Sequence, residues 1–372
     1  MPPLMSRAPA PLRPTDRVLI IRLGAVGDVV RTLPALRMLR ASFPGARLSW
    51  IVEDLAHALL EGHPDLDEVI RLPRRDLRDA ARRPWRLPRL AAALARDLRG
   101  RRFDAVLDFQ GSLKSALVAR LSGAPRRIGF GFGHGREMSF LLLTERLSPR
   151  RRRLNRVERN LLLAEAVGAA AEVVTLVLPE APGEGERAQA ILRDLRPDGA
   201  PIVLLSPGAS RRQAYKKWPA ERYGRLAALL RSDPGAAPLV AWGPGEEDLA
   251  RRVAQASGGA AAVLPATGLR LLAAILRRSD LFVGADTGPM HLAWAVGCPV
   301  VALFGPTDPA LNAPFGPGHS VLRRGATMDA LTIEEVAAAA RDALRRAPAR
   351  RGASAPAVPR TVAAGGVPRA AP

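Results

Sequence analysis

The residues best suited to chemistry near the start of the chain lie in the segment 22–28, RLGAVGD. Gly24 and Gly27 let the backbone turn sharply and approach a ligand, but their spacing is not the G-x-G-x-x-G fingerprint of dinucleotide-binding sites. Asp28 follows at the start of an expected helix. There it either caps the helix by accepting backbone N–H bonds or takes a proton from an acceptor hydroxyl as a general base. The two roles carry equal weight and are compatible.

A second segment, SPGA at residues 206–209, is suited to binding phosphate. It follows an expected strand, and small residues expose backbone N–H groups to phosphate oxygens. Lys216 and Lys217 come shortly after it and offer positive charge. Taken alone, the pattern is more typical of a solvated lysine pair before a helix that begins with proline.

The most specific segment is DTGPMH at residues 286–291. Gly288 and Pro289 open a helix whose free N–H groups form an anion site that suits a diphosphate. In the alternative, purely structural interpretation, Asp286 or Thr287 caps the helix and His291 is a buried, hydrogen-bonded side chain. For His291 the structural role is favoured.

No metal site is predicted. The five histidines of the chain show no metal-ligand spacing. The second half has no Asp-x-Asp pair at the end of a strand, although Asp286 and Asp308 follow different strands and could converge on a cation. Each of the two also has a structural explanation, as a helix cap and as a turn residue before Pro309.

Alternating apolar runs and helical patterns indicate the elements that position these segments. Strands are expected at residues 17–22, 47–52, 68–72, 103–109, 202–206, 239–242, 281–284 and 300–304. Helices are expected at residues 29–41, 156–167, 220–232, 246–257, 269–278 and 289–296, and a further basic helix within 76–102. This alternation predicts right-handed βαβ units. The fold class is therefore α/β, with two Rossmann-like doubly wound lobes facing a cleft at the carboxyl ends of both sheets.

The same pattern divides the chain. We expect a flexible N-terminus (1–14), a first lobe (15–178), a hinge rich in proline, glycine and glutamate (179–200) and a second lobe (201–346). The last segment, 347–372, consists largely of Arg, Ala, Gly and Pro without periodicity, and we expect it to be disordered.

Composition fits a globular, intracellular protein. The 372 residues suffice for two domains, and 48% apolar with 24% charged residues is typical of a folded chain. A single cysteine, Cys298, excludes an internal disulfide and favours a reducing cytosol. The first 14 residues lack the apolar core of a signal peptide. Residues 161–178 carry Glu165 and Glu172, which argue against a membrane span.

The formal net charge of +21 favours an anionic partner. The arginine run at 151–153 resembles a nucleic-acid footprint, but no zinc finger, aromatic RNA-binding signature or recognition helix accompanies it. A proteome rich in arginine explains the charge equally well. A nucleic-acid-binding protein thus stays an alternative, as does an oxidoreductase, which the missing dinucleotide fingerprint disfavours.

Taken together, the motifs resemble the ADP-heptose:lipopolysaccharide heptosyltransferases of glycosyltransferase family 9. RLGAVGD with TLPAL (22–36) is similar to that family's first loop and helix. SPGA with KKWP (206–219) is similar to its central motif, and DTGPMH with GPTDP (286–309) to its nucleotide-sugar signature. Order and distances match over residues 17–324, most of the chain.

The resemblance implies a GT-B fold and an inverting enzyme that moves a heptose from ADP-heptose to the lipopolysaccharide inner core, with no metal and no cofactor. It implies that Asp28 is the catalytic base and that Lys216, two residues before Trp218, holds the donor phosphates. The donor-binding residues that it implies are Ser206, Gly208, Ala209, Lys216, Glu246, Thr267, Asp286, Thr287, Gly288, Pro289, Met290 and His291.

Some assignments stay open. The stretch between Ala209 and Lys216 is longer and more basic than in some members, so the phosphate ligand is either Lys216 or Lys217. Glu247 is an alternative to Glu246. Gly208 and Ala209 stand where some relatives carry hydroxyl residues, so backbone contacts must replace side-chain contacts there.

The partners implied by the resemblance are a nucleotide-sugar donor and a lipid-linked saccharide acceptor. It implies no nucleic acid, a cytoplasmic location and peripheral contact with the inner membrane. The competing interpretation within the same family is an enzyme that uses another nucleotide sugar or another glycolipid acceptor.

Overall fold

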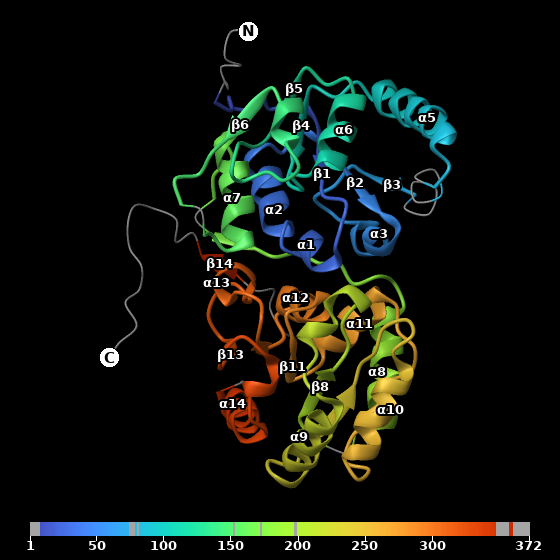
Figure 1. Cartoon of the computed structure of the whole chain (residues 1–372), viewed down its shortest axis with the longest axis vertical. Helices are drawn as coiled ribbons and strands as arrows, with labels where there is room; N and C mark the ends of the chain where they lie inside the picture. Colours follow the sequence, from blue (N-terminus) through green and yellow to red (C-terminus); the bar gives the residue numbers. More distant parts are fainter. Residues whose placement is uncertain are drawn as a thin grey trace.

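The molecule consists of two lobes, which lie one above the other in Figure 1. The computed structural model describes residues 8–73, 79, 82–151, 153–171, 173–196, 199–346 and 357–359. Each lobe is built on a six-stranded sheet, and every strand pair within the two sheets is parallel. The predicted α/β class is confirmed.

The first sheet has the order β3-β2-β1-β4-β5-β6. Its strands are β1 (Arg17–Ile21), β2 (Arg47–Glu53), β3 (Glu68–Leu72), β4 (Ala105–Asp108), β5 (Arg126–Phe130) and β6 (Glu145–Leu147). Its helices are α1 (Val26–Val30), α2 (Leu33–Ser42), α3 (Asp54–Leu60), α5 (Leu87–Gly100), α6 (Leu113–Leu121) and α7 (Arg156–Ala166), with the short 3-10 helices η1 (Pro84–Arg86) and η2 (Ser139–Leu142). The central strands are continuous apolar runs because helices cover both faces of a parallel sheet.

The second sheet repeats this order as β10-β9-β8-β11-β12-β13. Its strands are β8 (Ile202–Ser206), β9 (Ala237–Val240), β10 (Ala262–Val263), β11 (Leu281–Ala285), β12 (Val300–Phe304) and β13 (Ser320–Arg323). The helices are α8 (Glu184–Leu195), α9 (Ala220–Ser232), α10 (Glu247–Ala256), α11 (Leu269–Arg277), α12 (Gly288–Ala295), α13 (Pro309–Asn312) and α14 (Ile333–Arg346), with the 3-10 helices η3 (Arg211–Lys216) and η4 (Met328–Ala330). The strand order reverses beside the first strand of each sheet, where doubly wound folds bind their ligands.

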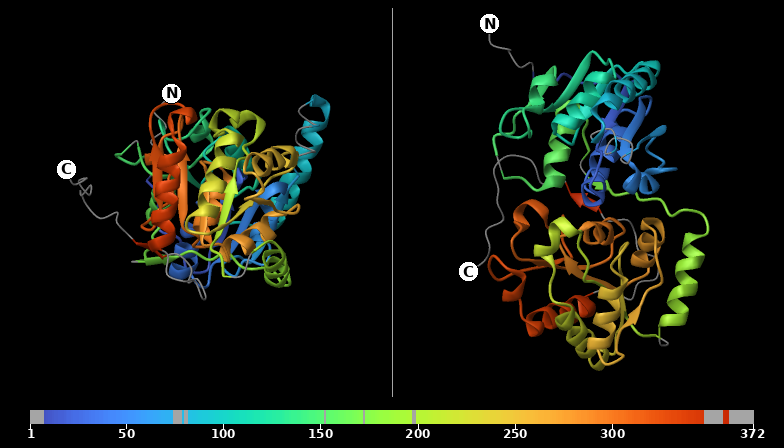
Figure 2. Two further views of the ribbon diagram at one scale, coloured as in Figure 1. Left: turned by 90° about the horizontal axis from the view of Figure 1, so that it is seen from below. Right: turned by 45° about the vertical axis from the view of Figure 1, so that its right-hand side comes forward.

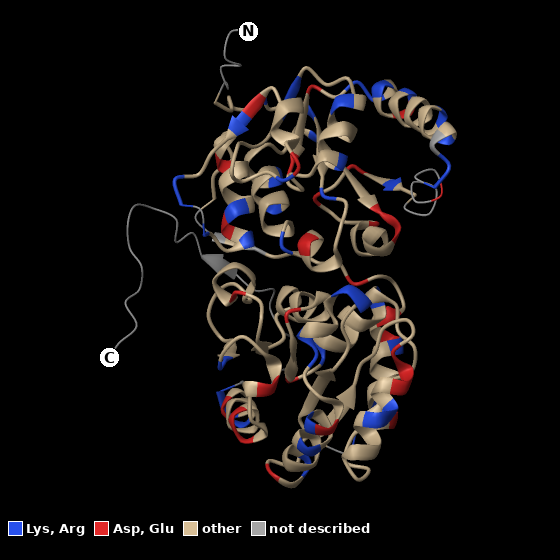
Figure 3. Ribbon diagram, in the orientation of Figure 1, with Lys and Arg blue, Asp and Glu red and all other residues tan. Residues whose placement is uncertain are grey.

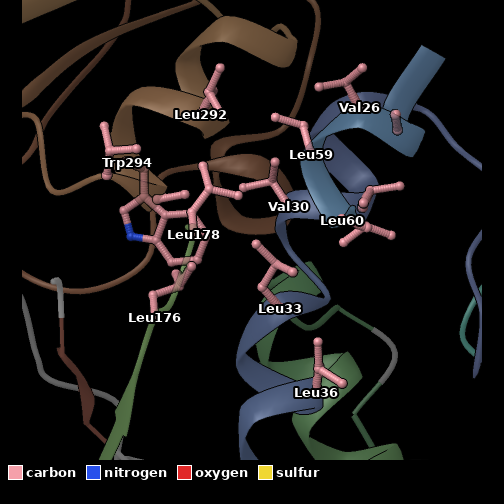
Figure 4. Close-up of a cluster of buried hydrophobic side chains, with 14 of the residues drawn as sticks. Val26, Val30, Leu33, Leu36, Leu59, Leu60, Leu176, Leu178, Leu292 and Trp294 are labelled. Atoms are coloured by element: carbon pink, nitrogen blue, oxygen red, sulfur yellow. The ribbon is translucent and has the colours of Figure 1, made fainter. Parts of the chain in front are cut away.

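One hydrophobic core runs across both lobes. Val26 and Val30 of α1, Leu59 of α3 and Leu292 and Trp294 of α12 belong to the same buried cluster, and Figure 4 shows them facing one another across the boundary. Burial of apolar area between the lobes stabilises their contact at about 25 cal/mol per Å². The two lobes are therefore packed together rather than merely tethered.

Two details differ from the sequence-based expectations. The expected helix 29–41 is divided into α1 and α2 by a break at Arg31 and Thr32. The expected hinge, 179–200, contains the helix α8, which packs against α11; a run of Glu, Arg, Ala and Leu outweighs the glycines beside it, since these residues favour helix. Figure 2 shows α8 running alongside the second lobe.

Parts of the expected terminal segments lie outside the described residues. These are residues 1–7 at the start and, at the end, all of 347–372 except β14 (Ala357–Pro359). β14 pairs antiparallel with β7 (Val173–Thr175), so these three residues form a strand where disorder was expected. Within the described part, no helix is both long and apolar enough to cross a membrane.

Candidate active site

A cavity of about 300 Å³ brings the predicted motifs of the two lobes together. The first lobe contributes residues from α1 and its two ends, the start of α7 and the loop after β5, while the second contributes residues from η3, the loop after β11, α12 and α13. The lining residues are Ala25, Gly27, Asp28, Arg31, Arg136, Arg156, Gln213, Lys216, Asp286, Thr287, Gly288, His291 and Asn312.

Asp28 stands on the first-lobe side of this cavity. It is the third residue of α1 and caps nothing, because the N-cap position is Ala25. Its Oδ1 accepts a hydrogen bond from Nη2 of Arg31 at 2.5 Å and lies 3.0 Å from Nη2 of Arg22. Burial alone would raise the pKa of Asp28, but the two guanidinium groups outweigh it and hold the pKa well below its usual range. Asp28 is therefore ionised and oriented.

Arg22 is held in place by the loop that follows β4. Its side chain is buried, and Nη1 donates to the carbonyl of Phe109 at 2.5 Å. Asp108 lies fully buried near this guanidinium and accepts bonds from the backbone N–H groups of Gln110 and Gly111 and from Ser115. Burial raises the pKa of Asp108 to about 6 despite these bonds. Asp108 thus supports the loop that holds Arg22.

Further arginines lie on the first-lobe side, and Arg156 is the one that also lowers the pKa of Asp28. Arg156 and Arg136 line the cavity, and Arg159 lies over the ring of Phe130, with 3.9 Å between the guanidinium carbon and the ring centroid. Burial, and then the charge of Arg156, lower the pKa of Arg159 to about 10. The first-lobe side therefore carries more positive than negative charge.

On the second-lobe side, a hydrogen-bonded chain links three side chains. Nζ of Lys216 donates to the carbonyl oxygen of Asp286 at 2.9 Å and to its Oδ2 at 3.0 Å. Nε2 of His291 lies 3.3 Å from Oδ1 of Asp286. Burial disfavours the Asp286 carboxylate, yet His291 and Lys216 hold its pKa well below the usual range. Burial, and then Arg31, lower the pKa of His291 to about 4, so the imidazole is neutral at pH 7.

The two sides meet where Gly27 faces His291. A Cβ atom on Gly27 would lie 2.5 Å from Cδ2 of the imidazole, a distance that real side chains do not tolerate. Arg31 also crosses the boundary, donating to Oδ1 of Asn312 at 2.9 Å. Glycine at position 27 therefore permits the close approach of α1 and α12 that places both motifs in one cavity.

The remaining predicted donor residues lie along the carboxyl edge of the second sheet. Ser206 ends β8, Glu246 precedes α10 after β9, and Thr267 lies in the loop between β10 and α11. Gly208 lies against Glu246, since a Cβ atom there would come within 2.1 Å of Oε2. None of these residues, nor the buried Ala209, lines the cavity.

The two lysines of the central motif differ in environment. Lys216 is buried, lines the cavity and pairs with Asp286. Lys217 is more exposed, and its Nζ lies 3.8 Å from Oε1 of Glu246. The structure thus separates the two candidates that the sequence left open, with Lys216 inside the cavity.

One predicted donor residue, Met290, is inaccessible to a ligand. Met290 is completely buried and belongs to the hydrophobic core, so its side chain packs rather than touching a ligand. Pro289 is half-buried in the first turn of α12 and does not line the cavity either. Thr287 is the N-cap residue of α12, but its hydroxyl donates to the carbonyl of Ala285 instead of capping the helix.

Five cavity residues were missed by sequence reasoning: Arg31, Arg136, Arg156, Gln213 and Asn312. Only Arg31 had a local signal, because it follows Asp28 by three residues and therefore shares its helix face. The others come from segments that only the tertiary fold brings to the cavity.

The two aspartates considered for metal binding do not converge. Asp286 pairs with Lys216, whereas Asp308 caps α13 and forms an ion pair with Arg153 of the first lobe. Among the described residues, no group of three or more His, Cys, Asp and Glu side chains is arranged to hold a metal ion. Activity without metal remains a prediction.

Comparison with known proteins places these features in a family. The model of glycosyltransferase family 9 (heptosyltransferase) matches residues 91–336. Lipopolysaccharide heptosyltransferase 1 of Escherichia coli strain K12 is 32% identical over 317 residues, which cover 82% of this chain and 93% of that protein. The same enzyme of Pseudomonas aeruginosa is 32% identical over 306 residues, 81% of each chain.

Solved structures agree with the sequence comparison. The structure of E. coli heptosyltransferase WaaC with ADP has a TM-score of 0.71 and 30% identity, covering 88% of this chain and 99% of that one. The structure of WaaC with ADP-2-deoxy-2-fluoro heptose has a TM-score of 0.68 at 30% identity, covering 86% and 97%.

Proposed function

The chain belongs to glycosyltransferase family 9, and on that premise we propose that it transfers a heptose from ADP-heptose to the inner core of lipopolysaccharide. The observation that carries the proposal is the cavity between the lobes, where Asp28 of one motif faces Lys216 and Asp286 of two others. WaaC, which resembles this chain over almost its whole length, is bound to ADP in one structure and to an ADP-heptose analogue in another.

In the proposed reaction, Asp28 removes the proton of an acceptor hydroxyl, whose oxygen attacks the anomeric carbon of the donor. The attack comes from the face opposite the leaving diphosphate, so the configuration inverts. The arginines that lower the pKa of Asp28 also weaken it as a base. An anionic substrate group beside Arg31 would compete for that guanidinium and make the carboxylate more basic when the substrate is bound.

The leaving diphosphate needs positive partners that are already in place. Lys216 provides a charge-assisted donor, and the first turn of α12, which begins at Gly288, provides backbone N–H groups. Asp286 holds the lysine ammonium in position before the donor arrives. Preorganised donors of this kind contribute several kcal/mol to transition-state stabilisation.

Ser206, Gly208, Ala209, Glu246 and Thr267 complete the proposed donor site. Ser206 is the last residue of β8, and the others lie in the loops that follow β8, β9 and β10, along one edge of the second sheet. This edge suits the nucleoside of the donor, because the diphosphate and the sugar then reach the cavity itself. Gly208 offers backbone only, so contacts there are made by N–H and carbonyl groups.

The acceptor in this proposal is a lipid-linked saccharide. The enzyme then acts on the cytoplasmic face of the inner membrane, in peripheral contact with it, and binds no nucleic acid. The surplus of arginines on the first-lobe side of the cavity supports an acceptor that carries anionic groups.

A transfer assay against ADP-, UDP- and GDP-sugars tests the proposal. We expect ADP-heptose to be the preferred donor, with binding and transfer both lost for the UDP- and GDP-sugars. Preference for another nucleotide sugar would assign the chain to another activity within family 9. Binding of none of them, together with salt-sensitive binding of duplex DNA, would overturn the assignment as a transferase.

A further inference from the structure

Large exposed apolar side chains of the described residues gather mainly on the first lobe. Several of them come from α6 and from the adjoining segment 131–142, which ends in η2. We define an apolar platform by these five: Leu113, Leu117, Phe132, Met138 and Leu141. Phe132 is 76% exposed and Met138 57%, fractions that leave most of each side chain in water.

The platform is part of the folded structure. Segment 131–142 is fastened to the start of α6, because Arg136 N–H donates to the carbonyl of Gly111 at 2.8 Å and Glu137 Oε2 accepts the N–H of Leu113 at 3.2 Å. The ring of Phe132 packs edge-on against Phe140 at 5.6 Å between centroids. The apolar side chains are therefore presented to solvent by an ordered surface.

Helix α6 shows the same arrangement. Leu113 and Leu117 lie one turn apart on its exposed side, while Ala116 and Ala119 are buried beneath. Exposed apolar side chains that gather on the neighbouring elements α6 and η2 are typical of an interaction site.

Positive charge is interleaved with the apolar side chains. Lys114 and Arg120 share the exposed side of α6, Arg136 lies two residues before Met138, and Arg146 stands over the ring of Phe140 at 5.6 Å. The acidic groups nearby are Glu137 and Glu53, and Glu53 is paired with Lys114 at 2.6 Å. Figure 3 shows basic segments along α5 and α6 of the upper lobe.

Apolar side chains between cations match the surface of an anionic bilayer. Apolar groups enter the boundary between headgroups and acyl chains, and cations meet the lipid phosphates. A protein partner would need shape complementarity over a larger area than five side chains provide. The surface therefore favours lipid over protein.

We propose that the apolar platform docks the enzyme on an anionic lipid bilayer and so presents the cavity to a membrane-embedded acceptor. Arg136 belongs to both surfaces, since it lines the cavity and lies within segment 131–142. Docking through the platform thus brings the cavity near the headgroup layer. This inference rests on the proposed function in one respect, because the membrane-embedded acceptor is the reason for the enzyme to dock.

The first experiment measures flotation of the full chain with vesicles. Vesicles of phosphatidylglycerol and phosphatidylcholine are compared with vesicles of phosphatidylcholine alone, at low and at high salt. We expect binding to the anionic vesicles only, weakened by salt. The triple variant Leu117→Ser, Phe132→Ser, Met138→Ser should bind at least about tenfold more weakly, since it removes three inserting side chains.

Matched controls come from the second lobe. Leu229→Ser and Val321→Ser change side chains that are also exposed, 37% and 41%, but lie far along the chain from the platform. They should bind vesicles like the wild type. Each single platform variant is measured as well, so a triple variant that fails to fold does not remove the test. Equal losses in the controls would overturn the proposal.

Trp85, 71% exposed beside the basic helix α5, is the competing anchor. The proposal would be overturned if Trp85→Ser lost vesicle binding while the platform variants bound normally. It would also be overturned if the wild-type protein did not bind anionic vesicles. Transfer to a deacylated, water-soluble acceptor separates this inference from the proposed function. Platform variants should keep that activity, and its absence in the wild type would count against the proposed function alone.

Discussion

The two sides of the cavity differ in how their charged side chains are balanced. On the first-lobe side, Arg31, Arg136 and Arg156 face the single carboxylate of Asp28. On the second-lobe side, Lys216 and Asp286 neutralise each other and His291 is uncharged. A paired network holds its members in place before any substrate arrives, whereas a surplus of cations changes when an anion binds. In the proposed reaction, the second lobe therefore supplies preorganisation, and the first lobe responds to the bound substrate.

The largest effect is expected at Asp28, the centre of the first-lobe side. Asp28→Asn keeps a side chain of the same shape but cannot accept the acceptor proton, so turnover should fall at least about a hundredfold. Initial rates with ADP-heptose and acceptor measure this. Asp308→Asn is the matched control, because Asp308 pairs with Arg153 outside the cavity lining, and its turnover should change little. Near-normal turnover of Asp28→Asn would remove it as the base.

The next largest effect is expected on the second-lobe side. Lys216→Ala should weaken donor binding by about 1.5–3 kcal/mol, the value of a charge-assisted contact, and also leaves Asp286 without its cation. Lys217→Ala is the matched control, since its ammonium lies outside the cavity lining beside Glu246. Calorimetric titration with ADP compares the two. If Lys217→Ala loses as much affinity as Lys216→Ala, the proposed role of Lys216 is wrong.

A smaller effect is expected behind the first-lobe side, at Asp108. Folding raises the pKa of the Asp108 carboxyl group to about 6, so its ionised form destabilises the folded state. This destabilisation is fully present well above that pKa and disappears as the pH falls from about 6 toward the ordinary pKa of an aspartate. Asp108→Asn removes the buried charge while its amide can still bond Gly111 N–H and Ser115. Its free energy of unfolding should exceed that of the wild type by about 1 kcal/mol or more at pH 8.

Urea unfolding at pH 8 and at pH 4.5 tests this sign. The difference between Asp108→Asn and the wild type should shrink at the lower pH, where the native carboxyl group is already protonated. A variant that is less stable at pH 8 would show instead that the carboxylate stabilises the fold through Arg22.

The smallest effect is expected from chelation. Both sides of the cavity already hold cationic side chains, so the leaving diphosphate has protein partners and activity should survive excess EDTA. Magnesium should stimulate turnover only modestly. Complete loss of activity in EDTA, restored by magnesium or manganese, would recast Asp286 and Asp308 as metal ligands and abolish the contrast between the two sides.

Much of the fold was encoded locally. Strands β8 and β12 and helix α9 have the bounds expected from the sequence, because continuous apolar runs and amphipathic periodicity are local properties. The short strands β5, β6, β10 and β13 were not expected. They are two to five residues long and several carry charged side chains, so only pairing with a neighbour makes them strands.

By itself, the sequence determined the α/β fold, the family and the three motifs, because each motif is a local pattern that follows a buried strand. Only the tertiary structure decided which residues share the cavity. Arg136 and Arg156 look like ordinary surface arginines until the fold brings them beside Asp28. Met290 shares a motif with His291, but helix rotation turns it into the core. Such placements depend on packing between segments far apart in the chain, which no local pattern records.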